Sequence, residues 1–364
     1  MSLPAAFAGS SRAAALGQVA IAPPTFGPNW FATVMGTGIV ANAVATLPWQ
    51  PPALVVAGRV VWLLAALLLV VVTVSTVVHH HRQATTVRRY LDDPVLSHFH
   101  GAVAMAPLTV GAGALLVGRP VVGTAAAVVM AATLWAVGTL LGLATAVVLP
   151  LRLLATHRYR SSEAAGSWLM PVVPPMVSAA TGPLLLPYLP TSAARSALLP
   201  ACLALFVLAL GLSLVVFVPL GRRLLRHGVG PAASVPTLLI VLGPLGQSVT
   251  AAHTMGEGAG GAGPAAGLAY GLPTWVLTIA WLVIASTITA RTARAGMPFS
   301  MTWWSFTFPV GTVVTGTSAL AAASGSTVLA VTAQVLFTGL VAAWLLVGTR
   351  TLIGLRDGSL TRPA

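Results

Sequence analysis

Long apolar runs separated by short polar segments make up most of the chain. None shows the two-residue alternation of apolar and polar positions that the strands of a membrane barrel require. A helix needs about 20 mainly apolar residues to cross the hydrocarbon core of a bilayer. The runs that reach this length are 29–48, 53–78, 98–117, 121–149, 168–187, 195–218, 234–256, 266–290, 303–322 and 327–347. The pattern predicts an all-α polytopic membrane protein with ten transmembrane helices.

The composition supports this class and excludes several others. Hydrophobic residues account for 57% of the chain and charged residues for 6%, whereas a soluble domain carries about 25% charged residues. A cytosolic globular protein and a disordered chain are therefore excluded. The single cysteine, Cys202, excludes an intramolecular disulfide and a cysteine-built zinc site. Because the basic residues are scattered between apolar runs and form no stripe, we expect no nucleic-acid partner.

The basic residues, all arginines, predict the orientation of the chain. Fifteen of the 18 lie in the N-terminal tail, the loops after even-numbered runs and the C-terminal tail; Arg59, Arg119 and Arg195 lie on the other side. Basic loops stay in the cytoplasm, so we expect cytoplasmic tails at 1–27 and 349–364 around a transport domain at 28–348. The arginine-only, alanine-rich composition is typical of a GC-rich bacterial genome, which suggests a bacterial inner (plasma) membrane.

Short links between several pairs of runs predict five antiparallel hairpins, and proline separates the odd-numbered runs from the even-numbered ones. Interior prolines occur in runs 3, 5, 7 and 9, and run 1 carries glycines at a similar depth, whereas the even-numbered interiors hold essentially none. Proline bends a helix, and broken backbone is tolerated in lipid where it faces protein or a water-filled cavity. We therefore expect kinked odd-numbered helices to line a central pore, with the even-numbered helices outside. The predicted kink and lining positions are Gly36, Gly38, Pro107, Pro174, Pro175, Pro244 and Pro309.

Five motifs, one on each odd-numbered run, resemble the tellurite-resistance/dicarboxylate transporter family. They are WFATVMGTGIV (30–40), HFHGAVAMAPLTV (98–110), SWLMPVVPPMVSAATG (167–182), GPLGQS (243–248) and WWSFTFPVGT (303–312). That family includes slow anion channels, tellurite-resistance proteins, malate permeases and sulfite efflux pumps. The resemblance implies ten helices in five hairpins around a quasi-fivefold pore, usually as a homotrimer. The first and fourth motifs look closest to the sulfite-efflux and malate-permease branches.

The resemblance also implies a pore gate. In channel members a phenylalanine that precedes a proline in the ninth helix plugs the pore, and the matching residue here is Phe308, followed by Pro309. An aromatic side chain beside a kink can equally be a packing residue, so both interpretations stay open at this point.

The acidic residues limit the substrate class. All five lie at the ends of runs, in loops or in the C-terminal tail: Asp92, Asp93, Glu163, Glu257 and Asp357. Cation pathways and proton relays usually need a carboxylate within the membrane. We therefore expect a small inorganic or organic anion as the substrate, with sulfite or a C4-dicarboxylate such as malate first and nitrate and chloride open. Possible anion contacts are Thr37, His100, Thr109, Ser178, Gln247, Ser248 and Thr312, whose hydroxyl and amide groups could alternatively form interhelical hydrogen bonds.

Two further classes remain as alternatives. A proton-coupled anion transporter could use His98 or His100, which open the third run. An intramembrane enzyme would need a nucleophile, base or metal cluster at one depth, and the runs contain none. We expect no cofactor and no metal, because His79, His80 and His81 are consecutive and do not share a helical face.

Overall fold

The computed structural model describes residues 27–82, 90–93, 95–155 and 163–360. The predicted N-terminal tail lies outside the described residues except for Gly27, and so do Arg12, Arg88, Arg89, Arg158, Arg160 and Arg362. All regular secondary structure in the described part of the chain is helical, which confirms the all-α prediction. Eight of its helical stretches are long and apolar enough to cross a membrane, so the chain is a multi-pass membrane protein.

Five long helices correspond to the even-numbered runs. They are α2 (Pro52–Arg82), α6 (Thr124–Ala155), α8 (Ser192–His227), α10 (Gly263–Arg294) and α12 (Thr327–Arg356). In the most apolar window of each, only 17–28% of the residues are buried inside the protein. Apolar side chains such as Leu140, Val215 and Val276 are therefore left on the outer surface, where lipid would cover them. We call these five elements the outer helices.

Five buried segments correspond to the odd-numbered runs, and each begins with a 3-10 turn that changes to α-helix. The pairs are η1 (Pro28–Trp30) with α1 (Phe31–Thr46), η2 (Leu96–Phe99) with α4 (His100–Gly113), η5 (Gly166–Leu169) with α7 (Pro174–Thr181), η7 (Ala232–Val241) with α9 (Leu242–Ala259), and η8 (Met301–Phe306) with α11 (Phe308–Ser324). Beyond α4 the chain forms a π-helical turn, η3 (Ala114–Gly118), and the short α5 (Arg119–Val122); beyond α7 it forms η6 (Gly182–Tyr188). The three of these segments long enough to span a membrane are 78–89% buried. We call all five the inner segments.

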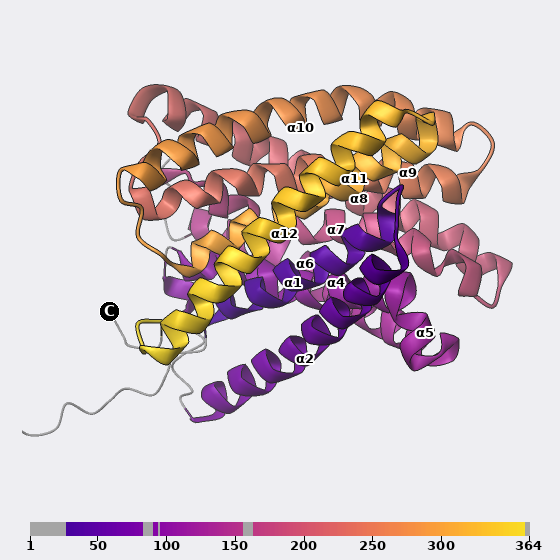
Figure 1. Ribbon diagram of the computed structural model, residues 1–364, viewed down its shortest axis with the longest axis horizontal. Helices are drawn as coiled ribbons and strands as arrows, with labels where there is room; N and C mark the ends of the chain where they lie inside the picture. The colour runs from indigo at the N-terminus through magenta and orange to yellow at the C-terminus, as the bar shows by residue number, and fades with distance from the viewer. Residues whose placement is uncertain (1–26, 83–89, 94, 156–162, 361–364) are drawn as a thin grey trace, which may run out of the picture.

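The inner segments contact one another in a closed order, α1 to α4, α7, α9, α11 and back to α1. Each outer helix packs against two neighbours in that order: α2 against α1 and α4, α6 against α4 and α7, α8 against α7 and α9, α10 against α9 and α11, and α12 against α11 and α1. In Figure 1 the labels of α1, α4 and α7 lie toward the middle of the molecule, with α10 and α2 at its edges.

Proline acts differently from the sequence prediction. Run 168–187 is not one helix, because Pro171, Pro174 and Pro183 divide it into η5, a turn, the eight-residue α7 and η6. Outer helices contain prolines too: Pro200 lies inside α8 and Pro273 inside α10. A single proline removes one hydrogen bond, which a long helix tolerates, whereas closely spaced prolines also disfavour α geometry at the residues before them.

Pro150 and Pro219 also lie inside outer helices, because α6 and α8 continue past them to Ala155 and His227. α1 and α7 are both shorter than a full membrane span. The contrast between the two sets of helices is therefore one of breakage and burial. The presence of proline alone does not separate them.

Tryptophans on the outer helices donate hydrogen bonds to the backbone of the inner segments. The indole nitrogen of Trp62 on α2 lies 3.0 Å from the carbonyl oxygen of Val110, and that of Trp135 on α6 lies 3.0 Å from the carbonyl of Ser178. Both carbonyls come shortly before the end of an α-helix, at its change to π- or 3-10-helix. Each carbonyl also accepts the backbone N–H of the residue that ends the helix, Ala114 or Gly182. The indole is therefore a second donor, which stabilises the helix end in apolar surroundings.

Further indole hydrogen bonds join outer helices to inner segments, both to backbone carbonyls and to threonine hydroxyls. Trp281 of α10 donates to the carbonyl of Leu238 within η7 at 2.9 Å. Trp344 of α12 donates to the hydroxyl of Thr37 at 3.1 Å, and Trp275 of α10 donates to that of Thr317 at 2.8 Å. Four of the five outer helices, α2, α6, α10 and α12, therefore form a hydrogen bond to an inner segment through an indole N–H group.

We expect Trp62→Phe to lower the free energy of unfolding by about 0.5–1.5 kcal/mol, because it removes the indole hydrogen bond to the buried Val110 carbonyl, which keeps the N–H of Ala114. Thermal unfolding in detergent micelles measures the change. Trp49→Phe is the matched control, since Trp49 is 49% exposed whereas Trp62 is 1% exposed. Equal melting temperatures for the two variants would contradict the stabilising role of the indole bond.

Candidate functional site

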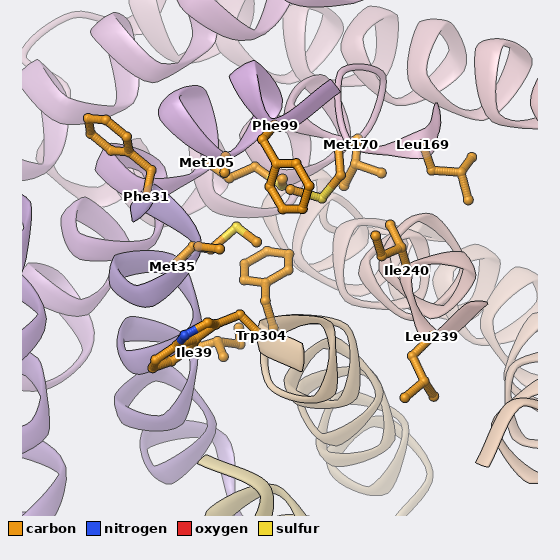
Figure 2. Packing of buried hydrophobic residues seen from close by; sticks show 14 of the residues in the cluster. Phe31, Met35, Ile39, Phe99, Met105, Leu169, Met170, Leu239, Ile240 and Trp304 are labelled. Atoms are coloured by element: carbon orange, nitrogen blue, oxygen red, sulfur yellow. The ribbon is translucent and has the colours of Figure 1, made fainter. Parts of the chain in front are cut away.

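A small cavity lies at the level where the inner segments change from 3-10 to α-helix. All five segments contribute to it, through Ala32, Met35, Phe99, Met105, Met170, Val173, Ile240, Gly243, Ser305, Phe308 and Pro309. Its volume is about 10 Å³, room for about one water molecule. Figure 2 shows Met35, Phe99, Met105 and Met170 pointing toward this shared space from three inner segments. We call this the central cavity.

Phe308 reaches the central cavity because of where α11 begins. Pro309 occupies the start of the helix, a position where the missing N–H group costs nothing. The hydroxyl of Thr307 donates to the carbonyl of Trp304 at 2.7 Å and closes the preceding 3-10 turn. Phe308 is 2% exposed and lines the cavity. Its placement is compatible with the gate implied by the resemblance, and the gate role stays a prediction.

The central cavity is almost entirely apolar. Among the described residues that line it, Ser305 carries the single polar side chain. An apolar cavity of this size cannot replace the hydration shell of an ion.

Sequence reasoning missed most of these lining residues, including Met35, Phe99, Met105, Met170 and Ile240. Apolar side chains are common in every run, so their type carried no signal. Four of the five lie inside the motifs, at or shortly after the change from 3-10 to α-helix. That shared position was the available clue.

Three of the predicted anion contacts bond to the outer helices. The hydroxyl of Thr37 accepts from Trp344. The hydroxyl of Ser178 donates to the carbonyl of Pro174 at 3.2 Å and accepts from Thr139 at 2.9 Å. Ser248 donates to the carbonyl of Leu245 at 2.8 Å and accepts from Tyr270 at 3.0 Å. These hydroxyls join helices, which is the alternative interpretation of their role.

The other predicted contacts bond within or between inner segments. Thr109 donates to Met105 at 2.8 Å, and Thr312 donates to the carbonyl of Leu242 at 3.0 Å. His100 places Nδ1 at 2.9 Å from the carbonyl of Ser97.

Gln247 differs from these six residues. It is 4% exposed, and its Oε1 has no hydrogen-bond partner among the described residues. It lies four residues after the cavity-lining Gly243 on α9, so it projects from the same helical face one turn further along. Of the seven predicted contacts, Gln247 is therefore the one with a buried polar atom still available to bind.

Glycines let neighbouring inner segments touch through their backbones. A Cβ on Gly101 would overlap the carbonyl of Met170, and one on Gly166 would overlap the carbonyl of Thr237. These contacts lie beside the 3-10 turns of α4, α7 and α9. Gly36 and Gly38 leave α1 continuous, and a Cβ on Gly38 would lie 2.8 Å from Cγ2 of Thr109. At all four positions the absent side chain permits close approach.

Arginine side chains gather at the end of the molecule where the inner segments begin. Arg223 is 8% exposed and donates to the carbonyls of Ala164 at 2.8 Å and Val229 at 3.3 Å. Arg152 forms a 2.8 Å ion pair with Asp92, in which both side chains are partly exposed. An exposed pair contributes little to stability, but the Arg223 bonds hold the loops around η5 and η7. We call this the arginine-rich end.

Comparison with known proteins gives a consistent picture. Residues 25–352 match the family model described as SLAC1, voltage-dependent anion channel. A sulfite efflux pump SSU1 of Arthroderma otae is 26% identical over 343 residues, which cover 91% of each chain. A sulfite efflux pump SSU1 of Trichophyton rubrum is 27% identical over 309 residues, 82% of each chain. An uncharacterized transporter of Methanocaldococcus jannaschii is 25% identical over 298 residues, 79% of this chain and 82% of its own.

We expect Gly101→Ala to destabilise the protein by about 1–3 kcal/mol, because the added methyl group pushes the backbones of α4 and the Met170 turn apart. Thermal unfolding of the purified protein measures the effect. Gly211→Ala on α8 is the control, since a Cβ there meets nothing within 4 Å and alanine favours helix. The close contact would be refuted if Gly101→Ala were as stable as Gly211→Ala.

Proposed function

The chain belongs to the SLAC1 voltage-dependent anion channel family, and from that premise we propose that it moves small anions across a membrane along the axis of the inner segments. The single observation that carries the proposal is the central cavity, to which all five inner segments contribute and which Phe308 lines. The matched relatives are named as channels and transporters, so the family supports transport and not catalysis.

The proposed path uses the predicted ten-helix arrangement, with five hairpins and the inner segments as its lining. The closed order of inner-segment contacts supports this path. The positions of the acidic residues support anions over cations, because Asp92, Asp93 and Glu257 lie at or beyond the ends of the spans. A path with neither carboxylates nor arginines at mid-membrane binds anions weakly and releases them quickly.

Phe308 is the proposed gate. A cavity of about 10 Å³ holds about one water molecule and is too small for an oxyanion of several heavy atoms, so the path is closed in this state. Rotation of the Phe308 ring would widen it at the apolar level. Ser305 offers a polar group in the cavity, and Gln247 lies one turn beyond the cavity-lining Gly243 on α9. Gln247 is the preferred candidate for substrate contact, because its buried Oε1 is unpartnered in the described chain and can accept a hydrogen bond from an anion that carries an O–H group, while its Nε2 can donate to an anion's oxygens.

Sulfite is the first proposed substrate, and a C4-dicarboxylate such as malate is the second. Three relatives named sulfite efflux pumps match 82–91% of this chain. Their identity of 26–27% supports a shared substrate class more than one specific anion.

Orientation and assembly are part of the proposal. The arginine-rich end would face the cytoplasm, with tails at 1–27 and 349–364, the latter beginning in the last turns of α12. The proposed location is a bacterial inner membrane, and the proposed assembly is the homotrimer that the family resemblance implies.

Proton coupling is the second candidate mechanism. His98 and His100 flank Phe99, which lines the central cavity together with Phe308. His98 stacks on Trp168 with ring centroids 6.1 Å apart. If the mechanism is coupled, anion flux follows a pH gradient and loses that dependence in His100→Ala. A passive channel gives flux that follows the anion gradient alone in both proteins.

We expect Phe308→Ala to raise basal anion flux in proteoliposomes at least severalfold, because it removes the ring from the constriction. Phe306→Ala is the matched control. Phe306 is also aromatic and lies two residues before Phe308, but its ring packs on that of Trp303, with the centroids 5.5 Å apart, and it does not line the cavity. Unchanged flux in a folded Phe308→Ala protein would return Phe308 to a packing role.

We expect sulfite to compete for transport more strongly than malate when each is added against a labelled anion in proteoliposomes. The same preparation measures cation flux under an equal gradient. Stronger competition by malate would assign the dicarboxylate class. Cation-selective current, or no anion flux under any gradient, would overturn the proposed function itself.

A further inference from the structure

A second and much larger pocket lies at the other end of the inner segments, away from the arginine-rich end. Its volume is about 380 Å³, compared with about 10 Å³ for the central cavity. The ends of three successive inner segments form it: η3 and α5 beyond α4, η6 beyond α7, and the last turns of α9. We call this the distal pocket.

Leucines and prolines make up much of the distal pocket wall, and five polar side chains join them: Arg119, Tyr188, His253, Thr254 and Glu257. A mainly apolar wall with a few convergent polar groups is the usual character of a small-molecule site.

Arg119 is the cationic group of the distal pocket. It is one of three arginines predicted to lie away from the arginine-rich end. Its Nη1 donates to the hydroxyl oxygen of Tyr188 at 2.9 Å, and among the described residues it forms no ion pair. Tyr188 fixes one edge of the guanidinium group and leaves the other N–H donors available, in the planar arrangement that suits an oxyanion.

The remaining polar groups define what else the ligand must satisfy. Because Tyr188 accepts from Arg119, its own hydroxyl proton is free to be donated. Thr254 already donates to the carbonyl of Ala180 at 3.0 Å. His253 and Glu257 are one turn apart on the same face of α9, so a carboxylate shares the pocket with the arginine.

We propose that the distal pocket is a binding site for small oxyanions with a single negative charge, held by Arg119 and Tyr188. This inference rests on the proposed transport function for its place on the path. Glu257 disfavours a second negative charge on the ligand and accepts a hydrogen bond from a ligand that carries its own O–H group. Hydrogensulfite and singly protonated dicarboxylates have this chemistry. An anion that has passed the central constriction meets this pocket before it leaves the protein.

Direct binding to the purified full chain tests the site without requiring transport. The probes are nitrate as a monoanion and sulfate as a dianion, each titrated while thermal unfolding is followed, because a bound ligand raises the melting temperature. Arg119→Gln weakens nitrate binding about tenfold. Glu257→Gln strengthens sulfate binding more than nitrate binding. Arg195→Gln is the matched control and leaves nitrate and sulfate binding unchanged. Arg195 donates hydrogen bonds to the carbonyl of Leu189 and lies outside the pocket.

The outcomes separate this site from the transport proposal. Nitrate binding that is unaffected by Arg119→Gln, or lost equally in Arg195→Gln, overturns the distal site even if flux is intact. Binding that depends on Arg119 in a protein that moves no anion upholds the site and overturns transport. With both proposals correct, Arg119→Gln raises the anion concentration for half-maximal flux only when the anion is added on the Arg119 side.

Discussion

Hydrogen bonding of broken backbone in apolar surroundings is the constraint on which this structure depends. Where the inner segments change between 3-10, α and π geometry, their backbone hydrogen bonding is irregular, and no water lies in the bilayer core to compensate. The outer helices place buried indoles at such points. The carbonyls of Val110 and Ser178 accept the backbone N–H groups of Ala114 and Gly182 and, as a second donor, the indoles of Trp62 and Trp135. Irregular backbone in the inner segments is therefore accompanied by indole hydrogen bonds from the outer helices.

The sequence predicted the helical class and the division between buried and exposed runs, because apolar length and clustered proline report directly on membrane crossing and on irregular backbone. It did not predict how run 168–187 divides, because several prolines compete and packing decides which one begins α7. A single proline such as Pro200 does not end a long helix, because the helix continues through it. The position of such a proline in the sequence therefore does not predict a break.

The candidate site was less predictable than the fold for a physical reason. Small polar residues within a membrane protein can bind a substrate or another helix, and the two uses look alike in a sequence. The roles of the Thr37, Ser178 and Ser248 hydroxyls in joining helices became clear only from their hydrogen-bond partners on outer helices. The lining of the central cavity is apolar, so no unusual residue type marked it. Phe308, which lines that cavity, was singled out because its motif carried information that its chemistry did not, and its gate role stays a prediction.

The backbone contacts at Gly101 and Gly166 bear on how fast such a protein could open. With α4, the Met170 turn and η7 already touching through main-chain atoms, the inner segments have little freedom to slide past one another near the constriction. Collective helix movements take microseconds to milliseconds, whereas a side chain changes rotamer far more quickly. If Phe308 is the gate proposed above, a rigid frame of this kind leaves opening to the reorientation of its ring. The interval between closed and open would then be set by a local torsional barrier and not by rearrangement of the whole bundle.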